Sequence, residues 1–368
     1  MVYSLNDYEQ CVECDVCSIY CQVYDVTKRE SYGPLGKIRV ARKIAHNEEL
    51  SSEEYESIYL CTGCGRCIVN CPYLIDIPQI VRNVRVELKK RGMVPERLSR
   101  IADRIIRYSN VMGKANEDRL QLYPKDLVLN KSSTVYMPGC IATFLVPNIV
   151  KSTINVLSKC LNFKVLGDKE RCCGSFLYDI GYVNEVSLLA KENTLLLEDM
   201  GIDRIILSCA TCYNTYHSVY PKLFREPKYE VYHVVQVLKE LIDEGRLSFK
   251  ENDYVKVVYV DACYLGRYSK IYEEPRAIIK KIPNVELVEF KENRELAPCC
   301  GAIVIKPFNR DVANAIALNV LREAEKLNVD YVITACPFCT FHYLDVKRRS
   351  EVKVEVLELT EFITKRLR

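Results

Sequence analysis

The chain of 368 residues has no tryptophan and only four histidines. It has no apolar run close to the roughly 18 residues that a helix needs to cross a bilayer. Its first residues show neither the basic start nor the apolar stretch of a secretory signal. An excess of one charge is also missing, since 52 basic residues face 49 acidic ones. We therefore expect a protein on the cytoplasmic side that has no transmembrane segment of its own and binds no nucleic acid.

Two nucleotide-binding patterns are absent as well. The sequence contains neither a G-x-G-x-x-G motif nor a P-loop. No nicotinamide or flavin site is therefore expected in this chain, and a first electron donor must lie elsewhere. Hydrophobic residues make up 49% and charged residues 27%, which is ordinary for a folded protein and excludes wholesale disorder. The length predicts two or three domains.

Cysteine is the residue in excess, with 19 copies. A secreted disulfide framework is short and carries an even number of cysteines, whereas this chain is long, has no signal and has an odd number. Thiolates are soft ligands, and a reducing compartment keeps them free to bind metal. We therefore expect most of these cysteines to be metal ligands.

Eight cysteines near the N-terminus form two copies of the pattern C-x2-C-x2-C-x3-C. This pattern is typical of bacterial ferredoxins, in which three close cysteines hold one [4Fe–4S] cube and the fourth crosses to the other cube. Zinc is disfavoured because zinc sites pair two C-x2-C units across a longer stretch. Pro72 follows the second copy, but Gln22 follows the first. The predicted ligand sets are Cys11, Cys14, Cys17 and Cys71 for one cube, and Cys61, Cys64, Cys67 and Cys21 for the other.

The second half of the chain contains an internal repeat. A lone cysteine, a Cys-Cys-Gly triplet and a C-x2-C pair occur twice in the same order, and 35 residues separate the triplet's cysteines from the final pair in both copies. The flanking sequences TVYMPGC and VVYVDAC also correspond. The two sets are Cys140, Cys172, Cys173, Cys209 and Cys212, and Cys263, Cys299, Cys300, Cys336 and Cys339.

Each repeat alternates β-rich runs with amphipathic segments, which predicts a small parallel sheet covered by helices. In the first copy we expect strands at 134–137, 163–166, 204–208 and 229–233, and helices at 147–160, 184–200 and 234–244. The lone cysteines and the C-x2-C pairs follow strands. Because ligands gather beyond the carboxyl ends of parallel strands, these cysteines are expected to converge there.

These motifs identify a family resemblance. The five-cysteine repeat resembles the CCG domain found in the B-type chain of heterodisulfide reductase. A ferredoxin domain followed by two such repeats is similar to the D-type iron–sulfur chain of that family. The likeness runs from about residue 8 to about residue 365. The layout is also similar to the iron–sulfur subunits of glycerol-3-phosphate, glycolate and lactate dehydrogenases, in which the cysteine sets are often incomplete, whereas both sets are complete here.

The resemblance implies that each five-cysteine set holds a noncubane [4Fe–4S] cluster and that these ten cysteines are the catalytic end. Cleavage of a disulfide needs two electrons, and the resemblance implies that two clusters each supply one electron and hold one sulfur. The segment DACYLGR, residues 261–267, resembles a family motif in which Pro and His stand at Ala262 and Tyr264. Two interpretations stay open there. Arg267 stabilises an anionic cluster or thiolate, or Asp261 and Arg267 brace the turn.

Three weaker features remain. Cys160 lies outside all four sets and is expected to be a small core residue. His342 is a candidate proton donor, although a hydrogen-bonded histidine within a helix is the simpler interpretation. Residues 82–107 carry nine Lys or Arg against three Asp or Glu. That run is interpreted as a solvated helical face, with docking to an acidic partner or a membrane surface as the alternative.

We therefore expect an α/β iron–sulfur oxidoreductase subunit that has an α-helical 2[4Fe–4S] ferredoxin domain and two tandem CCG repeats. Its leading function is reduction of a small heterodisulfide. The alternative is electron transfer between a flavin-linked dehydrogenase and membrane quinone. A flavoprotein or a membrane b-type cytochrome is the expected partner. The expected domains are a ferredoxin domain, a helical linker and two CCG repeats, at residues 1–85, 86–133, 134–250 and 251–368.

Overall fold

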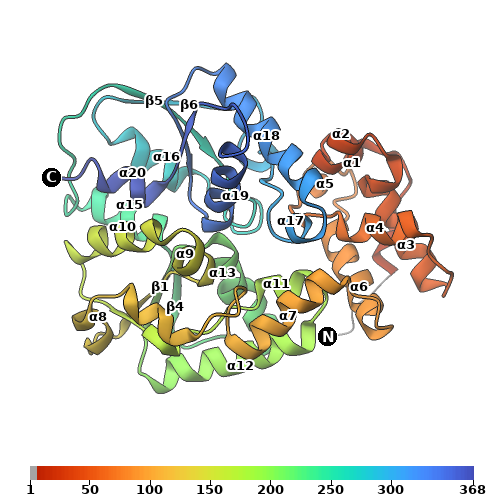
Figure 1. Ribbon diagram of the computed structural model, residues 1–368, viewed down its shortest axis with the longest axis horizontal. Coiled ribbons are helices and arrows are strands. Elements are labelled where there is room, and N and C mark those ends of the chain that lie inside the picture. Colours follow the sequence, from red (N-terminus) through yellow and green to blue (C-terminus); the bar gives the residue numbers. More distant parts are fainter. Residues whose placement is uncertain (1–5) are drawn as a thin grey trace.

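The computed structural model describes residues 6–368. Three bodies lie side by side in Figure 1: a helical N-terminal body (red to orange), a first α/β unit (yellow to green) and a second α/β unit (cyan to blue). Each α/β unit holds its own four-stranded parallel sheet. The expected fold class, a helical ferredoxin domain followed by two α/β repeats, is confirmed.

The N-terminal body consists of short helices that carry the two cysteine runs on the loops between them. Its longest helix, α6, begins with Pro78 in its first turn, where the missing amide N–H costs no hydrogen bond, and is capped by Asp76. Helix α4 begins with a capping box between Ser51 and Glu54. The helices are α1 (Val16–Ile19), α2 (Gln22–Thr27), α3 (Pro34–Ala45), α4 (Ser52–Tyr59), α5 (Arg66–Val69) and α6 (Ile77–Lys90), with a 3-10 turn at Asn6–Gln10.

The connection to the first α/β unit contains helix α7 (Glu96–Tyr108), a 3-10 turn (Asn116–Gln121) and α8 (Lys125–Leu129). Only Leu98, Ala102 and Ile105 of α7 are buried, because apolar side chains follow one face of the helix while its arginines follow the others.

The first α/β unit has the strand order β2-β1-β3-β4, all parallel. The expected strands and helices of this unit are present, with ends that differ by one or two residues. The strands are β1 (Thr134–Met137), β2 (Lys164–Val165), β3 (Arg204–Leu207) and β4 (Glu230–His233). The helices are α9 (Cys140–Leu145), α10 (Pro147–Ser158), α11 (Ser175–Asp179), α12 (Val183–Asp199), α13 (Ala210–Asn214), α14 (Tyr220–Leu223) and α15 (Val234–Asp243).

The second unit repeats this topology with the order β6-β5-β7-β8. Its central strand, VKVVYV, is buried along four consecutive residues, as expected for a parallel strand covered on both faces. The strands are β5 (Val255–Val260), β6 (Val285–Val288), β7 (Tyr331–Thr334) and β8 (Glu355–Glu358). The helices are α16 (Glu273–Lys280), α17 (Ile305–Phe308), α18 (Arg310–Lys326), α19 (Pro337–Lys347) and α20 (Leu359–Thr364).

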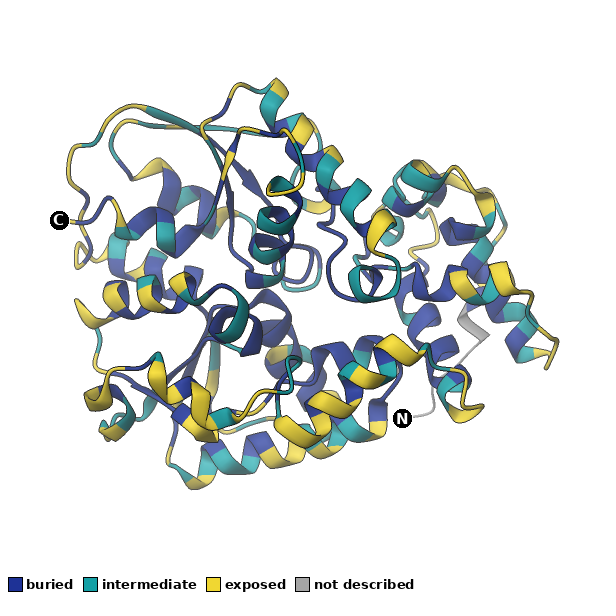
Figure 2. Ribbon diagram, viewed as in Figure 1, coloured by how far each residue is buried: buried dark blue, intermediate teal, exposed yellow. Residues whose placement is uncertain are grey.

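The two units pack against each other through two helices from each unit. Helix α10 of the first unit lies against α20 of the second, and α15 of the first lies against α16 of the second. Helix α10 corresponds to α16 in the second unit, and α15 corresponds to α20. The two contacts are therefore equivalent to each other, as in a dimer with two-fold symmetry. At the first contact, the Thr153 hydroxyl donates to the Thr360 hydroxyl at 3.0 Å. Buried residues line the sheets and this interface, while the outer faces of α7 and α12 are exposed (Figure 2).

Within residues 6–368, none of the helices has the length and apolar character needed to cross a bilayer.

Candidate iron–sulfur site

The second predicted ferredoxin set lines a single cavity. Cys21 reaches it from the start of α2, and Cys61, Cys64 and Cys67 reach it from the loop before α5 and from that helix itself. Cys21 is distant in sequence from the other three, so the fold brings together the same four cysteines that the crossed ferredoxin arrangement predicts. Burial raises the pKa of the Cys21 thiol, and the nearby Lys37 opposes that rise.

The first predicted set lies nearer the surface. Cys17 interacts electrostatically with Cys11 and Cys71, two members of its own predicted set. Burial and the carboxylate of Asp15 raise the pKa of Cys17 to about 12. Cys14 is exposed. The two ferredoxin sets adjoin each other, because the Cys67 thiol interacts with that of Cys17.

In the α/β units, the cysteines lie at the carboxyl ends of the strands, as the sequence predicts. Cys140 is the first residue of α9, after β1, while Cys209 and Cys336 are the N-cap residues of α13 and α19, after β3 and β7. Because the C-x2-C spacing spans one helical turn, Cys212 and Cys339 occupy the first turns of the same two helices. Backbone N–H groups at a helix start favour a thiolate over a thiol.

The Cys-Cys-Gly triplets form the same turn in both units. Gly174 and Gly301 have φ values of 80° and 76°, a left-handed conformation that suits glycine. In this turn the Gly174 N–H donates to the Cys172 Sγ at 3.4 Å, and the Gly301 N–H donates to the Cys299 Sγ at 3.4 Å. Such N–H···S bonds stabilise negative charge on a metal-binding sulfur.

All ten CCG cysteines are buried. In the second unit the Cys339 and Cys300 sulfurs are 3.3 Å apart, and Cys299 interacts with both Cys263 and Cys300. One small cavity is lined by all five cysteines of this set. The first unit has a similarly small cavity that is lined by four of its cysteines, and the fifth interacts with one of those four. These residues are Cys140, Cys172, Cys173 and Cys212, with Cys209 as the fifth.

Two contacts join cysteines of different sets across domain boundaries. The Cys64 thiol of the ferredoxin body interacts with Cys299 of the second α/β unit. The Cys336 thiol of that unit interacts with Cys209 of the first unit. With the Cys17–Cys67 contact, these interactions arrange the four sets in series, from the exposed Cys14 to the first α/β unit.

The geometry fits iron–sulfur clusters better than single metal ions. Among residues 6–368, no three His, Cys, Asp or Glu side chains converge closely enough to bind one ion directly. Instead, the cysteines surround cavities, as expected when several iron atoms lie between the ligating sulfurs. The cysteines that line these three cavities therefore have the donor chemistry and the arrangement that suit a cluster.

Arg267 and Asp261 have different roles. Asp261 braces the fold: it binds Arg276 through two hydrogen bonds of 2.7 Å and accepts a hydrogen bond from the Arg294 N–H. Arg267 is buried and donates to the carbonyl of Cys64 and to that of Ala297. Its positive charge therefore lies where the ferredoxin body meets the second α/β unit, beside the thiols of Cys64, Cys263 and Cys299.

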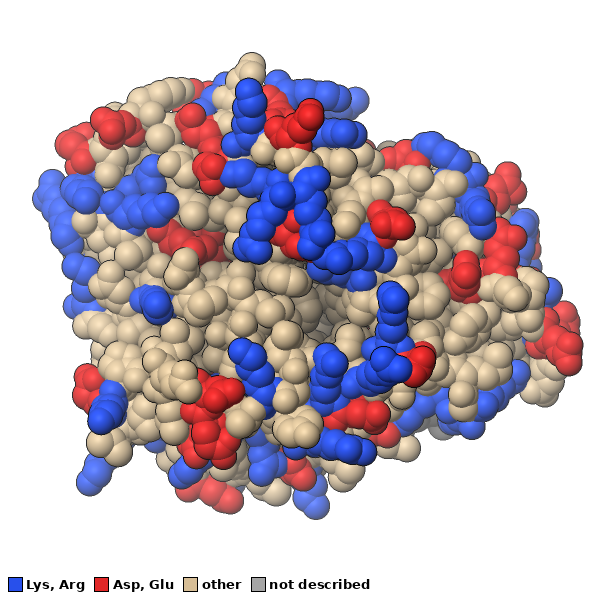
Figure 3. All heavy atoms as spheres, viewed as in Figure 1, with Lys and Arg blue, Asp and Glu red and all other residues tan. Residues whose placement is uncertain are grey.

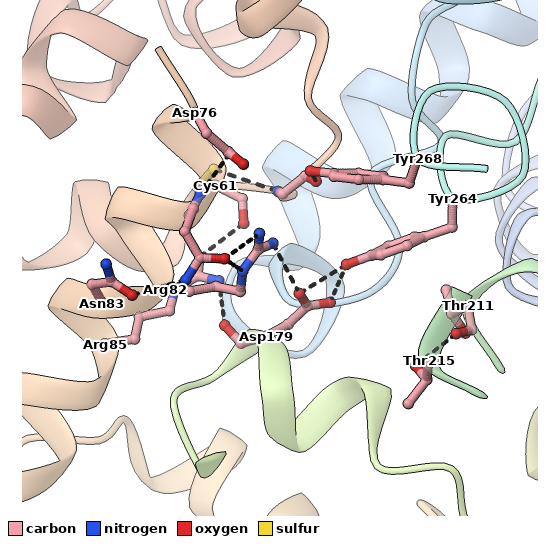
Figure 4. A network of polar contacts seen from close by, with 12 residues as sticks. Cys61, Asp76, Arg82, Asn83, Arg85, Asp179, Thr211, Thr215, Tyr264 and Tyr268 are labelled. Atoms are coloured by element: carbon pink, nitrogen blue, oxygen red, sulfur yellow. Dashed lines mark hydrogen bonds and ion pairs between the residues drawn. The ribbon is translucent and has the colours of Figure 1, made fainter. Parts of the chain in front are cut away.

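A buried polar network joins all three bodies (Figure 4). The Tyr264 hydroxyl, from the second α/β unit, donates to both carboxylate oxygens of Asp179 at 2.8 and 2.6 Å. Asp179 belongs to α11 of the first unit and lies 3.7 Å from the guanidinium of Arg82 on α6. Arg85 donates to the backbone carbonyls of Asp179 and Cys61. Sequence reasoning missed Asp179, and the one available signal was that Tyr264 departs from the family motif.

Three minor expectations have mixed outcomes. Arg82 and Arg85 are buried, so the interpretation of residues 82–107 as a solvated helical face is wrong for this part of α6, whereas the arginines of α7 are exposed as expected. Cys160 packs against the hydrophobic core as expected, although it is only half-buried, and its thiol donates to the Arg246 carbonyl at 3.0 Å. His342 is fully buried on α19 and bonds to the Cys300 carbonyl at 2.8 Å. Burial lowers its pKa to about 3, so the imidazole is neutral at neutral pH and has no imidazolium proton to give.

Comparison with known protein families gives matches to both parts of the chain. A 4Fe-4S dicluster domain matches residues 7–75, and the cysteine-rich CCG domain matches twice, over residues 134–216 and 257–343. The chain belongs to the family of iron–sulfur proteins that join a dicluster ferredoxin domain to two CCG domains. The family expected from the cysteine motifs is therefore confirmed, and the chain is an iron–sulfur electron-transfer protein.

Among its relatives is the D-type chain of dihydromethanophenazine:CoB–CoM heterodisulfide reductase from Methanosarcina barkeri. It is 29% identical, and the alignment covers 99% of this chain and 95% of the relative. The EtfAB:quinone oxidoreductase of Syntrophomonas wolfei is 24% identical over 98% of this chain and 58% of its own length. A crystal structure of a hypothetical protein from Helicobacter pylori matches 97% of this chain and 73% of that protein, with a TM-score of 0.63 and 12% identity. This last likeness shows the fold alone.

Proposed function

We propose that this CCG-family chain belongs to an oxidoreductase that reduces a small disulfide. The observation that carries the proposal is the contact between Cys209 and Cys336, where two complete five-cysteine sets meet. A substrate disulfide bound where the two sets meet has one sulfur beside each set. The similarity over nearly the whole chain to the heterodisulfide reductase of Methanosarcina barkeri supports this choice.

In this proposal the eight ferredoxin cysteines hold two [4Fe–4S] cubes and the ten CCG cysteines hold two noncubane [4Fe–4S] clusters. When bound, the clusters supply one-electron carriers for a reaction that needs two electrons. The protein's own residues set the order: Cys14 faces solvent, Cys64 meets Cys299, and Cys336 meets Cys209. Arg267 places a fixed positive charge beside the junction of Cys64 with Cys299.

The partner protein, a flavoprotein or a b-type cytochrome, docks in this proposal at the Cys14 end. Side chains around the first ferredoxin set are apolar and exposed, and apolar contact surface of this kind is typical of a protein interface. They are Val12, Ile19, Tyr73 and Leu74, with exposed fractions of 59%, 72%, 54% and 69%. As part of the same proposal, the complex acts on the cytoplasmic side.

A second candidate function uses the same series of sites for electron transfer between a flavin-linked dehydrogenase and membrane quinone. The name of one relative, the EtfAB:quinone oxidoreductase, supports it. In this case the CCG cysteines carry electrons onward and cleave no disulfide.

Viologen-dependent turnover separates the two functions. With anaerobically reconstituted protein and a panel of disulfides, reduced viologen should drive steady thiol release without a flavin subunit. Cys300→Ser and Cys173→Ser should abolish thiol release and leave viologen oxidation by the ferredoxin body, whereas Cys160→Ser should behave as wild type. The second function would be favoured if protein with its full iron content released no thiol from any disulfide of the panel and if quinone analogues reoxidised the reduced protein.

A further inference from the structure

Both CCG domains carry a tyrosine at the same position after their last cysteine. Tyr216 follows Cys212 by four residues. Tyr343 follows Cys339 by the same number, although the three residues between differ completely, YNT in the first domain and TFH in the second. Residues four apart lie on one face of a helix, and long side chains there point back toward the helix start. Each tyrosine therefore extends toward the turn that carries the C-x2-C cysteines.

The hydroxyl groups of both tyrosines lie beside cysteine sulfurs. Tyr216 lines the cavity of the first five-cysteine set and interacts electrostatically with Cys173 and Cys212. Tyr343 interacts with four of the five cysteines of the second set, which are Cys263, Cys299, Cys300 and Cys339. The same side chain therefore takes the same position against the sulfurs in both domains.

Neither hydroxyl has a hydrogen-bond partner among residues 6–368. Tyr216 is 1% exposed and Tyr343 is 0% exposed, so bulk water does not supply one. A buried hydroxyl that stays unpaired destabilises a protein, and such groups are rare in folded chains. Two of them at equivalent positions of two domains therefore indicate one shared acceptor chemistry.

The backbone acceptors next to the cysteines are bonded to other residues. In the first domain the Tyr220 hydroxyl donates to the Cys173 carbonyl at 2.9 Å. In the second domain the Cys300 carbonyl bonds to His342 at 2.8 Å. With these carbonyls engaged, the sulfur atoms of each site are the acceptors that remain beside the two tyrosines.

The open face of the CCG domains does not bring solvent to the two hydroxyls. In Figure 3 the surface is hollowed between helix α7 and the CCG domains, and basic side chains surround the opening. Ala302, Ile303 and Phe338 line both this hollow and the cavity of the second five-cysteine set, whereas neither tyrosine lines the hollow. The hollow meets the cysteine cavity through these apolar residues, so water that enters it does not solvate the tyrosines.

We propose that Tyr216 and Tyr343 each donate an O–H···S hydrogen bond to the iron–sulfur cluster of their own CCG domain. This role rests on the clusters of the proposed function and adds one cluster-binding residue to each set of cysteines. A tyrosine hydroxyl is a donor at neutral pH. Hydrogen bonds to cluster sulfur help to set the reduction potential, and they favour the reduced, more negative state. Each tyrosine therefore raises the potential of the cluster beside it.

Phenylalanine variants remove only the hydroxyl groups. Electron nuclear double resonance on full-length reconstituted protein, reduced with dithionite in H2O and in D2O, detects exchangeable protons that are coupled to the clusters. Tyr216→Phe and Tyr343→Phe should each lose one such proton, and the double variant should lose both. Tyr229→Phe is the matched control and should lose none, because that buried tyrosine interacts with Thr194 and Glu198 and with no cysteine.

Potentiometric titration followed by electron paramagnetic resonance gives a second readout. Each single variant should lower the potential of one CCG cluster and leave the ferredoxin cubes unchanged, because the lost bond stabilises the reduced state. Tyr229→Phe should leave every potential unchanged. A purely structural role of the hydroxyl groups would not shift the potential of a single cluster at full iron content.

Coupled exchangeable protons that persist in both phenylalanine variants would overturn the proposal, because the donor would then be a backbone N–H or a water molecule. Unchanged potentials at full iron content would also overturn it. Iron near half of the full content would overturn the CCG clusters of the proposed function together with this role. A protein that cleaves no disulfide but loses the protons as expected keeps the tyrosine bonds, since neither readout involves a substrate.

Discussion

The side-chain oxygen of Gln22 accepts a hydrogen bond from the backbone N–H of Cys299, with an N···O distance of 2.5 Å. Gln22 follows Cys21, the ferredoxin ligand that crosses to the second set, and Cys299 begins the Cys-Cys-Gly triplet of the second CCG domain. The bond therefore connects two cysteine sets through two residues that are 277 positions apart in sequence. A proline at position 22, as in the usual ferredoxin pattern, offers no such side-chain acceptor.

Loss of this acceptor should loosen the junction. Gln22→Leu leaves the part-buried Cys299 N–H without its partner, and we expect a destabilisation of about 1–3 kcal/mol. Anaerobic denaturant unfolding of the reconstituted protein measures it. Gln22→Glu keeps an acceptor oxygen and should retain most of the stability. Equal unfolding free energies for wild type and Gln22→Leu would show that the bond is unimportant.

Arg267 should tune the reduction potential at the same junction. A buried positive charge favours the reduced, more negative state of a nearby redox group, so Arg267→Gln should lower the potential of the clusters beside Cys64 and Cys299. Potentiometric titration followed by electron paramagnetic resonance measures the shift. Arg294→Gln removes an arginine that pairs with Glu273 in a more exposed position, and it should leave the potentials unchanged. An unchanged potential in Arg267→Gln would contradict this role.

Iron content tests the ligand sets directly. Anaerobically reconstituted protein should contain about 16 iron atoms per chain, from four clusters of about four atoms each. Iron near half that amount, with zinc present, would show that the CCG domains do not hold clusters. Cys209→Ser should lower the iron content and spare the ferredoxin spectrum. Cys160→Ser should change neither, because Cys160 is half-buried and bonds to a backbone carbonyl away from the four sets.

The buried carboxyl group of Glu358 should make the free energy of unfolding depend on pH. This carboxyl group is fully buried at the start of α20, and desolvation raises its pKa to about 8, with a smaller contribution from the neighbouring Glu361. The tyrosines that face it are Tyr136 and Tyr259. The folded state therefore holds this proton more tightly than the unfolded state, in which the pKa is about 4.3.

Stability linked to Glu358 is fully present below the unfolded pKa and declines as the pH rises toward 8, by up to on the order of 1.4 kcal/mol per pH unit. Glu358→Gln mimics the neutral form, so its unfolding free energy should fall less between pH 5 and pH 8 than that of the wild type. Denaturant unfolding across this range measures both slopes. Parallel slopes would mean that Glu358 is ionised in the folded protein.

The cysteine spacing and the repeat were enough to predict the family, the fold class and the strands of the first CCG domain. Local patterns sufficed because each strand is a short apolar run and each cysteine motif spans a single turn. The contacts between domains were not predictable in this way. The bond between Tyr264 and Asp179 joins residues 85 positions apart, and neither residue type alone indicates a buried partner.

The two CCG domains contact each other through equivalent helices, so each presents the same face to the other, as in a symmetric dimer. The ferredoxin body contacts such a pair off its axis, and Cys64 meets Cys299 of the second half. The two CCG domains therefore share a fold but cannot replace each other, because only the second contacts the ferredoxin body through its cysteines. In the proposed series of sites, damage in the second half would isolate the first from its electron supply, whereas damage in the first half would leave the second connected. The two halves are consequently free to diverge under different selection, one as a junction and the other as a terminus.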